Sequence, residues 1–93
     1  MLRISVTETK TEVRWILEGR LAGPWVAVLR KSWKSKHRSR KGRACIVDLH
    51  DVISVDQAGE ELLRGLLKRG AQLAGTALYV GDLLQRLKTG ERI

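Results

Sequence analysis

The chain has 93 residues, of which 43% are hydrophobic and 30% are charged, a composition that suits one small domain with a modest core. A single cysteine, Cys45, excludes an intramolecular disulfide and a multi-cysteine zinc site. No stretch approaches the roughly 20 apolar residues of a membrane span, and Met1 leads into a strand-like segment rather than a signal peptide, so we expect a cytoplasmic protein.

Two short strands are predicted at the start of the chain. In residues 2–7 and 12–17, apolar and polar side chains alternate with the period of a strand. The apolar face of the two segments consists of Leu2, Ile4, Val6, Val13, Trp15 and Leu17. The turn is predicted at Thr9 and Lys10. The short separation of the two segments indicates an antiparallel hairpin, although the usual Asn-Gly signal is absent.

An amphipathic helix is predicted after Gly23 and Pro24, because proline is favoured at the first helical position. One face of it carries residues at helical spacing: Trp25, Val28, Leu29, Ser32 and Trp33. We expect the tryptophans to be core anchors rather than stacking platforms for nucleic acid. The helix is predicted to fray into a basic connector over residues 34–43.

The positive charge is concentrated in one part of the chain. The net charge is +8, and residues 30–43 contain eight basic residues and no acid. The other ten basic residues are balanced by the ten acids. The eight cations are Arg30, Lys31, Lys34, Lys36, Arg38, Arg40, Lys41 and Arg43. They form either a solvated connector or a patch for an anionic partner, such as nucleic acid, phospholipid head groups or an acidic protein face.

The stretch from Ala44 to Leu67 organises the second half of the chain. It begins with an apolar strand over residues 44–49 that buries Cys45, followed by a predicted turn at 49–51 and a second apolar segment at 52–55. Asp56 then occupies the position of a helix N-cap, ahead of leucines at positions 62, 63, 66 and 67. Four possible ligands lie close together here, Asp48, His50, Asp51 and Asp56, but we predict no metal site.

The remaining elements complete an α/β pattern. Lys68, Arg69 and Gly70 are typical of a helix end, Gly75 is predicted to open a strand over 76–80, and a short helix is expected around Leu83 to Leu87. The alternation of strands and helices indicates parallel strands joined by right-handed crossovers. We therefore predict a single domain over residues 1–93, with about four strands in a mixed sheet and the order β-β-α-β-α-β-α.

The central pattern resembles the STAS family, the fold of bacterial anti-anti-sigma factors and of sulfate-transporter tails. Val47-Asp48-Leu49, Val52-Ile53 and Asp56-Gln57-Ala58-Gly59 follow in the order and spacing of the family. The resemblance covers nearly the whole chain. It implies a surface for a partner protein at the helix start, formed by Asp56, Gln57, Ala58, Gly59 and Glu60.

The chain departs from the family at the residue before that glycine. Switchable anti-anti-sigma factors have a serine or threonine there, which a partner kinase phosphorylates, whereas this chain has Ala58 and no hydroxyl. The resemblance therefore implies a module without that phosphorylation switch. Glu60 also replaces an apolar residue that usually follows the glycine.

Signatures of enzymes are absent from the sequence. No Gly-x-Ser-x-Gly occurs, and the glycines of Gly70 to Gly75 are spaced as in a phosphate loop, but Thr76 replaces the lysine. We predict no catalytic residues and no cofactor.

The main hypothesis is a non-catalytic regulatory module that binds a protein, such as a kinase-like anti-sigma factor. The alternatives are a small basic domain that binds anions through residues 30–43 and an accessory subunit of a transporter. The oligomeric state stays open.

Overall fold

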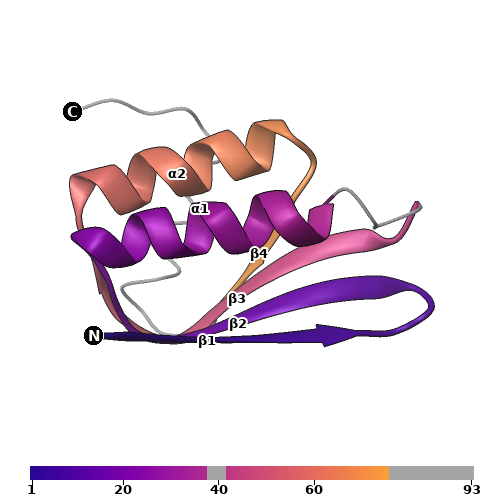
Figure 1. Cartoon of the computed structure of the whole chain (residues 1–93), viewed down its shortest axis with the longest axis horizontal. Helices are drawn as coiled ribbons and strands as arrows, with labels where there is room; N and C mark the ends of the chain where they lie inside the picture. The colour runs from indigo at the N-terminus through magenta and orange to yellow at the C-terminus, as the bar shows by residue number, and fades with distance from the viewer. Residues whose placement is uncertain (38–41, 76–93) are drawn as a thin grey trace.

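Four strands form one mixed sheet, in which their order in space, β1-β2-β3-β4, is also their order along the chain. This computed structural model describes residues 1–37 and 42–75. The described elements are β1 (Leu2–Glu8), β2 (Glu12–Leu21), α1 (Pro24–His37), β3 (Ala44–Val55), α2 (Gln57–Lys68) and β4 (Gln72–Ala74), as Figure 1 shows. The antiparallel hairpin and the parallel crossovers predicted from the sequence are confirmed.

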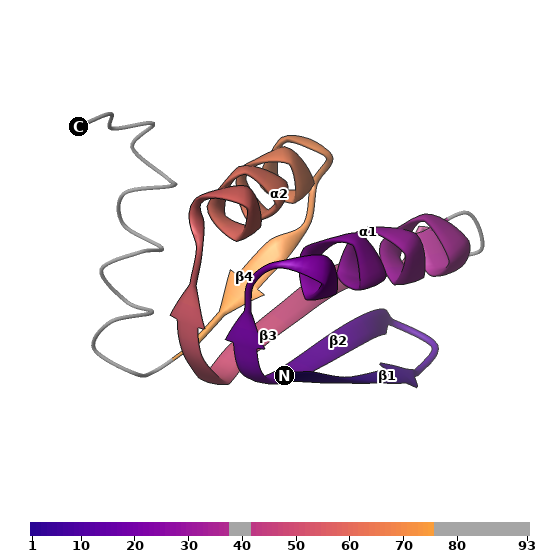
Figure 2. The ribbon, with the colours of Figure 1, turned by 60° about the vertical axis from the view of Figure 1, so that its left-hand side comes forward.

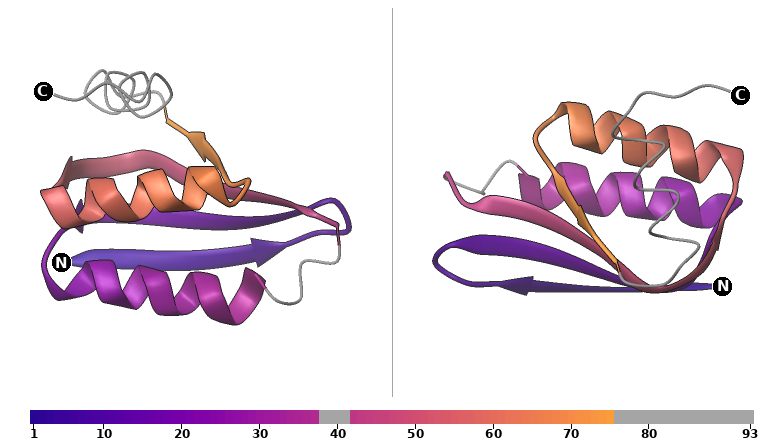
Figure 3. Two further views of the ribbon diagram at one scale, coloured as in Figure 1. Left: turned by 90° about the horizontal axis from the view of Figure 1, so that it is seen from above. Right: turned by 180° about the vertical axis from the view of Figure 1, so that it is seen from behind.

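Both described helices cover the same face of the sheet (Figures 1 and 2). β1 and β2 pair antiparallel, whereas β2–β3 and β3–β4 pair parallel. Crossovers between parallel strands are nearly always right-handed, and the two here move across the sheet in the same direction, so they place both helices on one side. Figure 3 shows α1 and α2 side by side above the strands. Neither has the length and apolar character that a helix needs to cross a membrane.

The core lies between the helices and the inward side of β2 and β3. Val13, Trp15 and Leu17 of β2 are fully buried, as the alternation predicts. The ring centroids of Trp15 and Trp33 lie 4.8 Å apart with their planes tilted by 37°, and such aromatic pairs contribute about 0.5–1.5 kcal/mol beyond the area they bury. The indole Nε1 of Trp15 donates to the Ser32 hydroxyl at 3.2 Å. The prediction that Trp33 anchors the core is confirmed.

The hairpin turn depends on a threonine in place of Asn-Gly. The Thr9 hydroxyl accepts from the backbone N–H of Glu12 at 3.0 Å and of Thr11 at 3.2 Å. The Thr9 N–H donates to the Glu12 carbonyl at 2.9 Å. The Thr9 hydroxyl thus satisfies two backbone donors of a turn that contains neither asparagine nor glycine.

The predicted end of the second strand at Leu17 is wrong, because β2 continues to Leu21. The backbone N–H of Arg20 donates to the Met1 carbonyl at 3.1 Å, which fixes the start of the chain against the end of β2. Gly19 has a φ of 108°, and a Cβ at this position would collide with the Met1 carbonyl oxygen. Glycine is therefore required where these two segments cross.

The predicted turn at residues 49–51 is also wrong, because β3 runs without a break from Ala44 to Val55. Its pairing with β2 shifts twice, and each time β3 contains one extra residue. At the first shift His50 and Asp51 are both exposed, and the inward side resumes at Val52. The polar residues therefore mark a β-bulge, which bends and twists a strand without ending it.

The end and the buried face of the first helix also differ from expectation. The helix α1 runs to His37, so Lys34 and Lys36 are helical rather than part of a connector. Its inward face includes Val26, which is 4% exposed, whereas Val28 is 46% exposed. The face predicted from the spacing was therefore right at Leu29 and Trp33, but it included the exposed Val28 and omitted the buried Val26.

The last described strand, β4, lies before Gly75 and follows the end of α2 closely. Gly70, with a φ of 93°, closes α2 as predicted. The N–H groups of Gly70 and Ala71 donate to the carbonyls of Leu67 and Leu66, each at 3.0 Å, which is a Schellman C-cap. The strand predicted at 76–80 and the helix predicted around 83–87 lie outside the described residues.

Two glycines of α2 have opposite surroundings. A Cβ on Gly59 would lie 2.7 Å from the Leu21 carbonyl oxygen and 2.8 Å from Cγ1 of Val55, whereas a Cβ on Gly65 would meet nothing within 4 Å. The first turn of α2 therefore approaches the ends of β2 and β3 too closely for any other side chain. At Gly65, in contrast, the helix has room for a side chain.

We predict opposite effects for the same substitution at these two positions. Gly59→Ala should lower the free energy of unfolding by about 1–3 kcal/mol because it overpacks a fixed contact. Gly65→Ala should raise it by about 0.5–1 kcal/mol because alanine favours the helix and is not obstructed. Urea unfolding followed by circular dichroism measures both. Destabilisation of equal size by the two variants would contradict the packing described here.

Candidate functional site

Two helices begin at the same edge of the sheet, where the parallel strands β2 and β3 end. β2 leads through Ala22 and Gly23 into α1, and β3 leads through Asp56 into α2. Neighbouring parallel strands have their carboxyl ends at one edge, so their connections lie side by side (Figure 1). We refer to residues Asp56–Glu60, at the start of α2, as the helix tip.

Asp56 joins the two connections through its side chain. Its Oδ1 accepts from the backbone N–H of Gly59 at 2.7 Å, which is the predicted N-cap bond, and its Oδ2 accepts from the N–H of Gly23 at 2.9 Å. The Asp56 N–H donates to the Leu21 carbonyl at 3.1 Å. The N-cap prediction is confirmed, and the second bond shows that one carboxylate fixes the start of α2 against the start of α1.

These bonds also favour the ionised carboxylate. The N–H of Gly23, and after it that of Gly59, lower the pKa of Asp56 from its ordinary value of 3.8. Both oxygens are engaged by backbone donors, and a carboxylate in this state is a weak base and a poor nucleophile. Asp56 therefore acts as a structural clamp.

The surface of the tip is formed by Gln57, Ala58 and Glu60. Gln57 and Ala58 are exposed, and Glu60 is partly exposed, whereas Gly59 is buried against Leu21. Of the predicted contact residues, Gln57, Ala58 and Glu60 can meet a partner directly. Gly59 instead allows the close packing beneath them.

The sequence interpretation did not include Gly23 and Pro24 in this site. Both are exposed, and the Gly23 N–H is bonded to the tip through Asp56. The parallel pairing of β2 with β3 could have indicated this, because it brings the exits of the two strands together. The candidate contact surface therefore extends from the tip to the first residues of α1.

The predicted cationic patch is divided by the fold. The ammonium of Lys36 and the guanidinium of Arg43 both bind the Glu8 carboxylate at 3.2 Å, and Arg43 also donates to the Thr9 carbonyl. Lys36 and then Arg43 lower the pKa of Glu8. Arg30 and Lys34 lie toward α2 instead, and Lys31 is exposed on α1. Arg38, Arg40 and Lys41 lie outside the described residues.

The four residues considered as metal ligands have separate roles. Asp48 pairs with the Arg14 guanidinium at 3.1 Å and accepts from the His50 N–H at 2.9 Å. The imidazole of His50 lies 3.2 Å from the Asp51 carboxylate, and Asp56 is the helix cap. Within residues 1–37 and 42–75, no three side chains of ligating type gather in a way that would hold a metal ion.

We predict that the clamp depends on pH. A carboxylate with a lowered pKa stabilises the fold above its unfolded pKa, near 3.8, and this stabilisation is lost as the pH falls through the lower, folded pKa. Asp56→Asn keeps one acceptor oxygen and turns an NH₂ toward the other N–H. Its deficit in the free energy of unfolding should be largest near neutral pH and should shrink below about pH 4.

Denaturant unfolding at a series of pH values between about 2 and 7 tests this prediction. Glu61→Gln is the matched control, because it removes an exposed carboxylate from the same helix. A deficit for Asp56→Asn that is the same at every pH would show that the charge of Asp56 is unimportant.

Comparisons with known proteins identify the fold. No family model matches the chain, and no curated protein matches its sequence. A solved structure described as the anti-sigma factor antagonist SpoIIAA in its unphosphorylated form is similar, with a TM-score of 0.69 and 14% identity over 90% of this chain and 83% of that one. A second, described as "Crystal Structure Analysis of Mglu", has a TM-score of 0.57 and 16% identity over 81% of this chain and 19% of that one.

At these identities the similarity concerns the backbone arrangement. It agrees with the antiparallel hairpin followed by two parallel crossovers and with the resemblance found in the sequence. The chain therefore has the STAS-like fold of the anti-sigma factor antagonist SpoIIAA.

Proposed function

We propose that the chain is a non-catalytic regulatory module that binds a protein partner through the helix tip, together with Gly23 and Pro24. The observation that carries this proposal is the Asp56 clamp, which fixes two chain segments and leaves Gln57 and Ala58 exposed above them. A surface that is ordered before binding loses less conformational freedom on association. The STAS-like fold supports the same use of this edge.

The similarity to the fold of an anti-sigma factor antagonist supports a choice of partner class. We propose a kinase-like anti-sigma factor in the cytoplasm, contacted at Ala58 and its neighbours. Because Ala58 is exposed and has no hydroxyl, this contact is not released by phosphorylation at that position. The population of the complex is then set by the concentrations of the two proteins and their affinity, and Glu60 adds a negative charge beside the contact.

The alternative of a basic domain that binds nucleic acid receives less support. Lys36 and Arg43 are held by Glu8, and Arg30 and Lys34 face the neighbouring helix. The described cations therefore do not form one continuous stripe along which a phosphate backbone could lie.

We predict that Ala58→Arg abolishes capture of the protein partner from a lysate of the source organism. A long cation in the centre of a closely packed contact should weaken binding by at least about tenfold. Ser35→Arg is the matched control, because Ser35 is an exposed helical residue near the end of α1, away from the tip. Equal capture by wild type, Ala58→Arg and Ser35→Arg would rule out the tip as the contact.

A second variant tests the class of the partner. If the captured protein is a kinase of the expected kind, Ala58→Ser should accept phosphate from ATP in its presence, and the wild type should not. Intact-mass spectrometry measures the added phosphate, and peptide mapping locates it. A partner that binds the tip but never modifies Ala58→Ser would retain the docking proposal and reject the kinase.

A further inference from the structure

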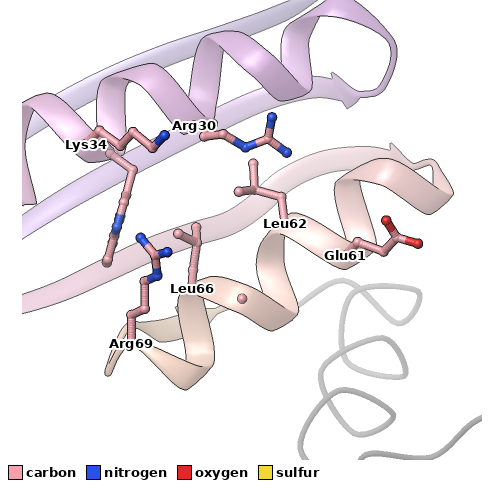
Figure 4. Close-up of a pocket in the computed structure, with 8 residues that line it drawn as sticks. Arg30, Lys34, Glu61, Leu62, Leu66 and Arg69 are labelled. Atoms are coloured by element: carbon pink, nitrogen blue, oxygen red, sulfur yellow. The ribbon is translucent and has the colours of Figure 1, made fainter.

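A hollow lies between α1 and α2, on the side of the helices away from the sheet (Figure 4). Its volume is about 310 Å³, and we refer to it as the interhelical groove. The residues that line it are Arg30, Trp33, Lys34, Glu61, Leu62, Gly65, Leu66 and Arg69. The volume is at the lower end of the range for small-molecule sites.

Three cationic side chains surround this groove. Arg30 and Lys34 come from α1, and Arg69 comes from the C-cap of α2. Figure 4 shows their charged ends around the tips of Leu62 and Leu66, while the Glu61 carboxylate points away from them. Among residues 1–37 and 42–75, none of the three cations forms an ion pair with a carboxylate. Three cations that line one groove without a paired carboxylate create a positive potential there, which favours a bound anion.

The floor of the groove is apolar and has unfilled space. Leu62, Leu66 and Trp33 form it, and they are 8%, 3% and 1% exposed. Gly65 lies between the two leucines on α2, and a Cβ there would meet nothing within 4 Å. A glycine inside a helix costs stability relative to alanine, and here it leaves room beside the cations for part of a ligand.

We propose that the interhelical groove binds a small organic phosphate monoester. Such a group carries a charge close to −2 at neutral pH and presents three strong acceptor oxygens, which match the three cationic groups. Guanidinium forks bind phosphate oxygens in pairs, and a lysine ammonium binds them as a point charge. The organic body of the ligand packs on Leu62, Leu66 and the space above Gly65.

The binding experiment uses the full chain and phenyl phosphate as the probe. Titration followed by ¹H–¹⁵N spectra should move the amide signals of α1 and α2 around the groove, and isothermal calorimetry gives the affinity. Inorganic phosphate and benzyl alcohol separate the contributions of the anion and of the organic body. Equal affinity for inorganic phosphate and phenyl phosphate would overturn the role of the organic body, and no binding of phenyl phosphate would overturn the site.

Neighbouring cations supply matched controls. Arg30→Gln and Arg69→Gln should each weaken binding of phenyl phosphate by at least about tenfold, the effect of losing a charge-assisted hydrogen bond. Lys31→Gln and Lys68→Gln remove the same charge from adjacent exposed residues that do not line the groove, and they should change the affinity less than about twofold. An equal loss in all four variants would show diffuse attraction rather than a site.

A third kind of variant fills the groove without changing its charge. Gly65→Leu should abolish binding of phenyl phosphate while the unfolding midpoint stays at or above that of the wild type, because the position is open. Unchanged binding by this folded variant would overturn the proposal.

Flotation with phosphatidylcholine vesicles, with and without phosphatidic acid, then distinguishes a lipid monoester from a soluble one. Binding to the tip partner is measured separately with Ala58→Arg, so the two proposals fail independently.

Discussion

The end of the molecule at which α1 and α2 begin is held together by the carboxylate of Asp56. Its two oxygens accept from Gly59 in its own helix and from Gly23, which lies 33 residues earlier in the chain. The first bond is local and fixes where α2 begins. The second is tertiary and fixes how α2 meets the start of α1. A single side chain thus converts two adjacent strand exits into one ordered surface, and the close approach at Gly59 leaves that surface little freedom to move.

The sequence was sufficient for the parts of the fold that have strong local signals. The period-two alternation of Val13, Trp15 and Leu17 predicted a buried strand face, and the leucines of α2 predicted a buried helix face, because burial on one side dictates these spacings. The Asp56 cap was predictable for the same reason: its partner Gly59 is only three residues away. The alternation of strands and helices supplied the order of the elements, and the resemblance to the STAS family implied the same fold.

Other features depended on contacts that no local pattern contains. His50 and Asp51 have the composition of a turn, but pairing with β2 holds them in a continuous strand, where they become a bulge. The length of β2 beyond Leu17 likewise depends on its pairing with residues 52–55 of β3, which are distant in sequence. The cationic stretch appeared uniform because its acid, Glu8, lies 28 residues before Lys36. In the folded chain, Lys36 and Arg43 pair with Glu8, whereas Arg30 and Lys34 line the interhelical groove.

The bond between Met1 and Arg20 has a practical consequence for handling the protein. Met1 is 87% exposed, and its carbonyl is fixed at the end of β2, the same end at which α1 and α2 begin (Figure 1). A purification tag or linker joined to Met1 would therefore emerge beside the helix tip and compete with a partner for space. The hairpin turn at Lys10 lies at the opposite end of the sheet, and Cys45 is buried. A thiol introduced as Lys10→Cys would therefore be the accessible one among the described residues, and coupling through it would leave the tip facing solution.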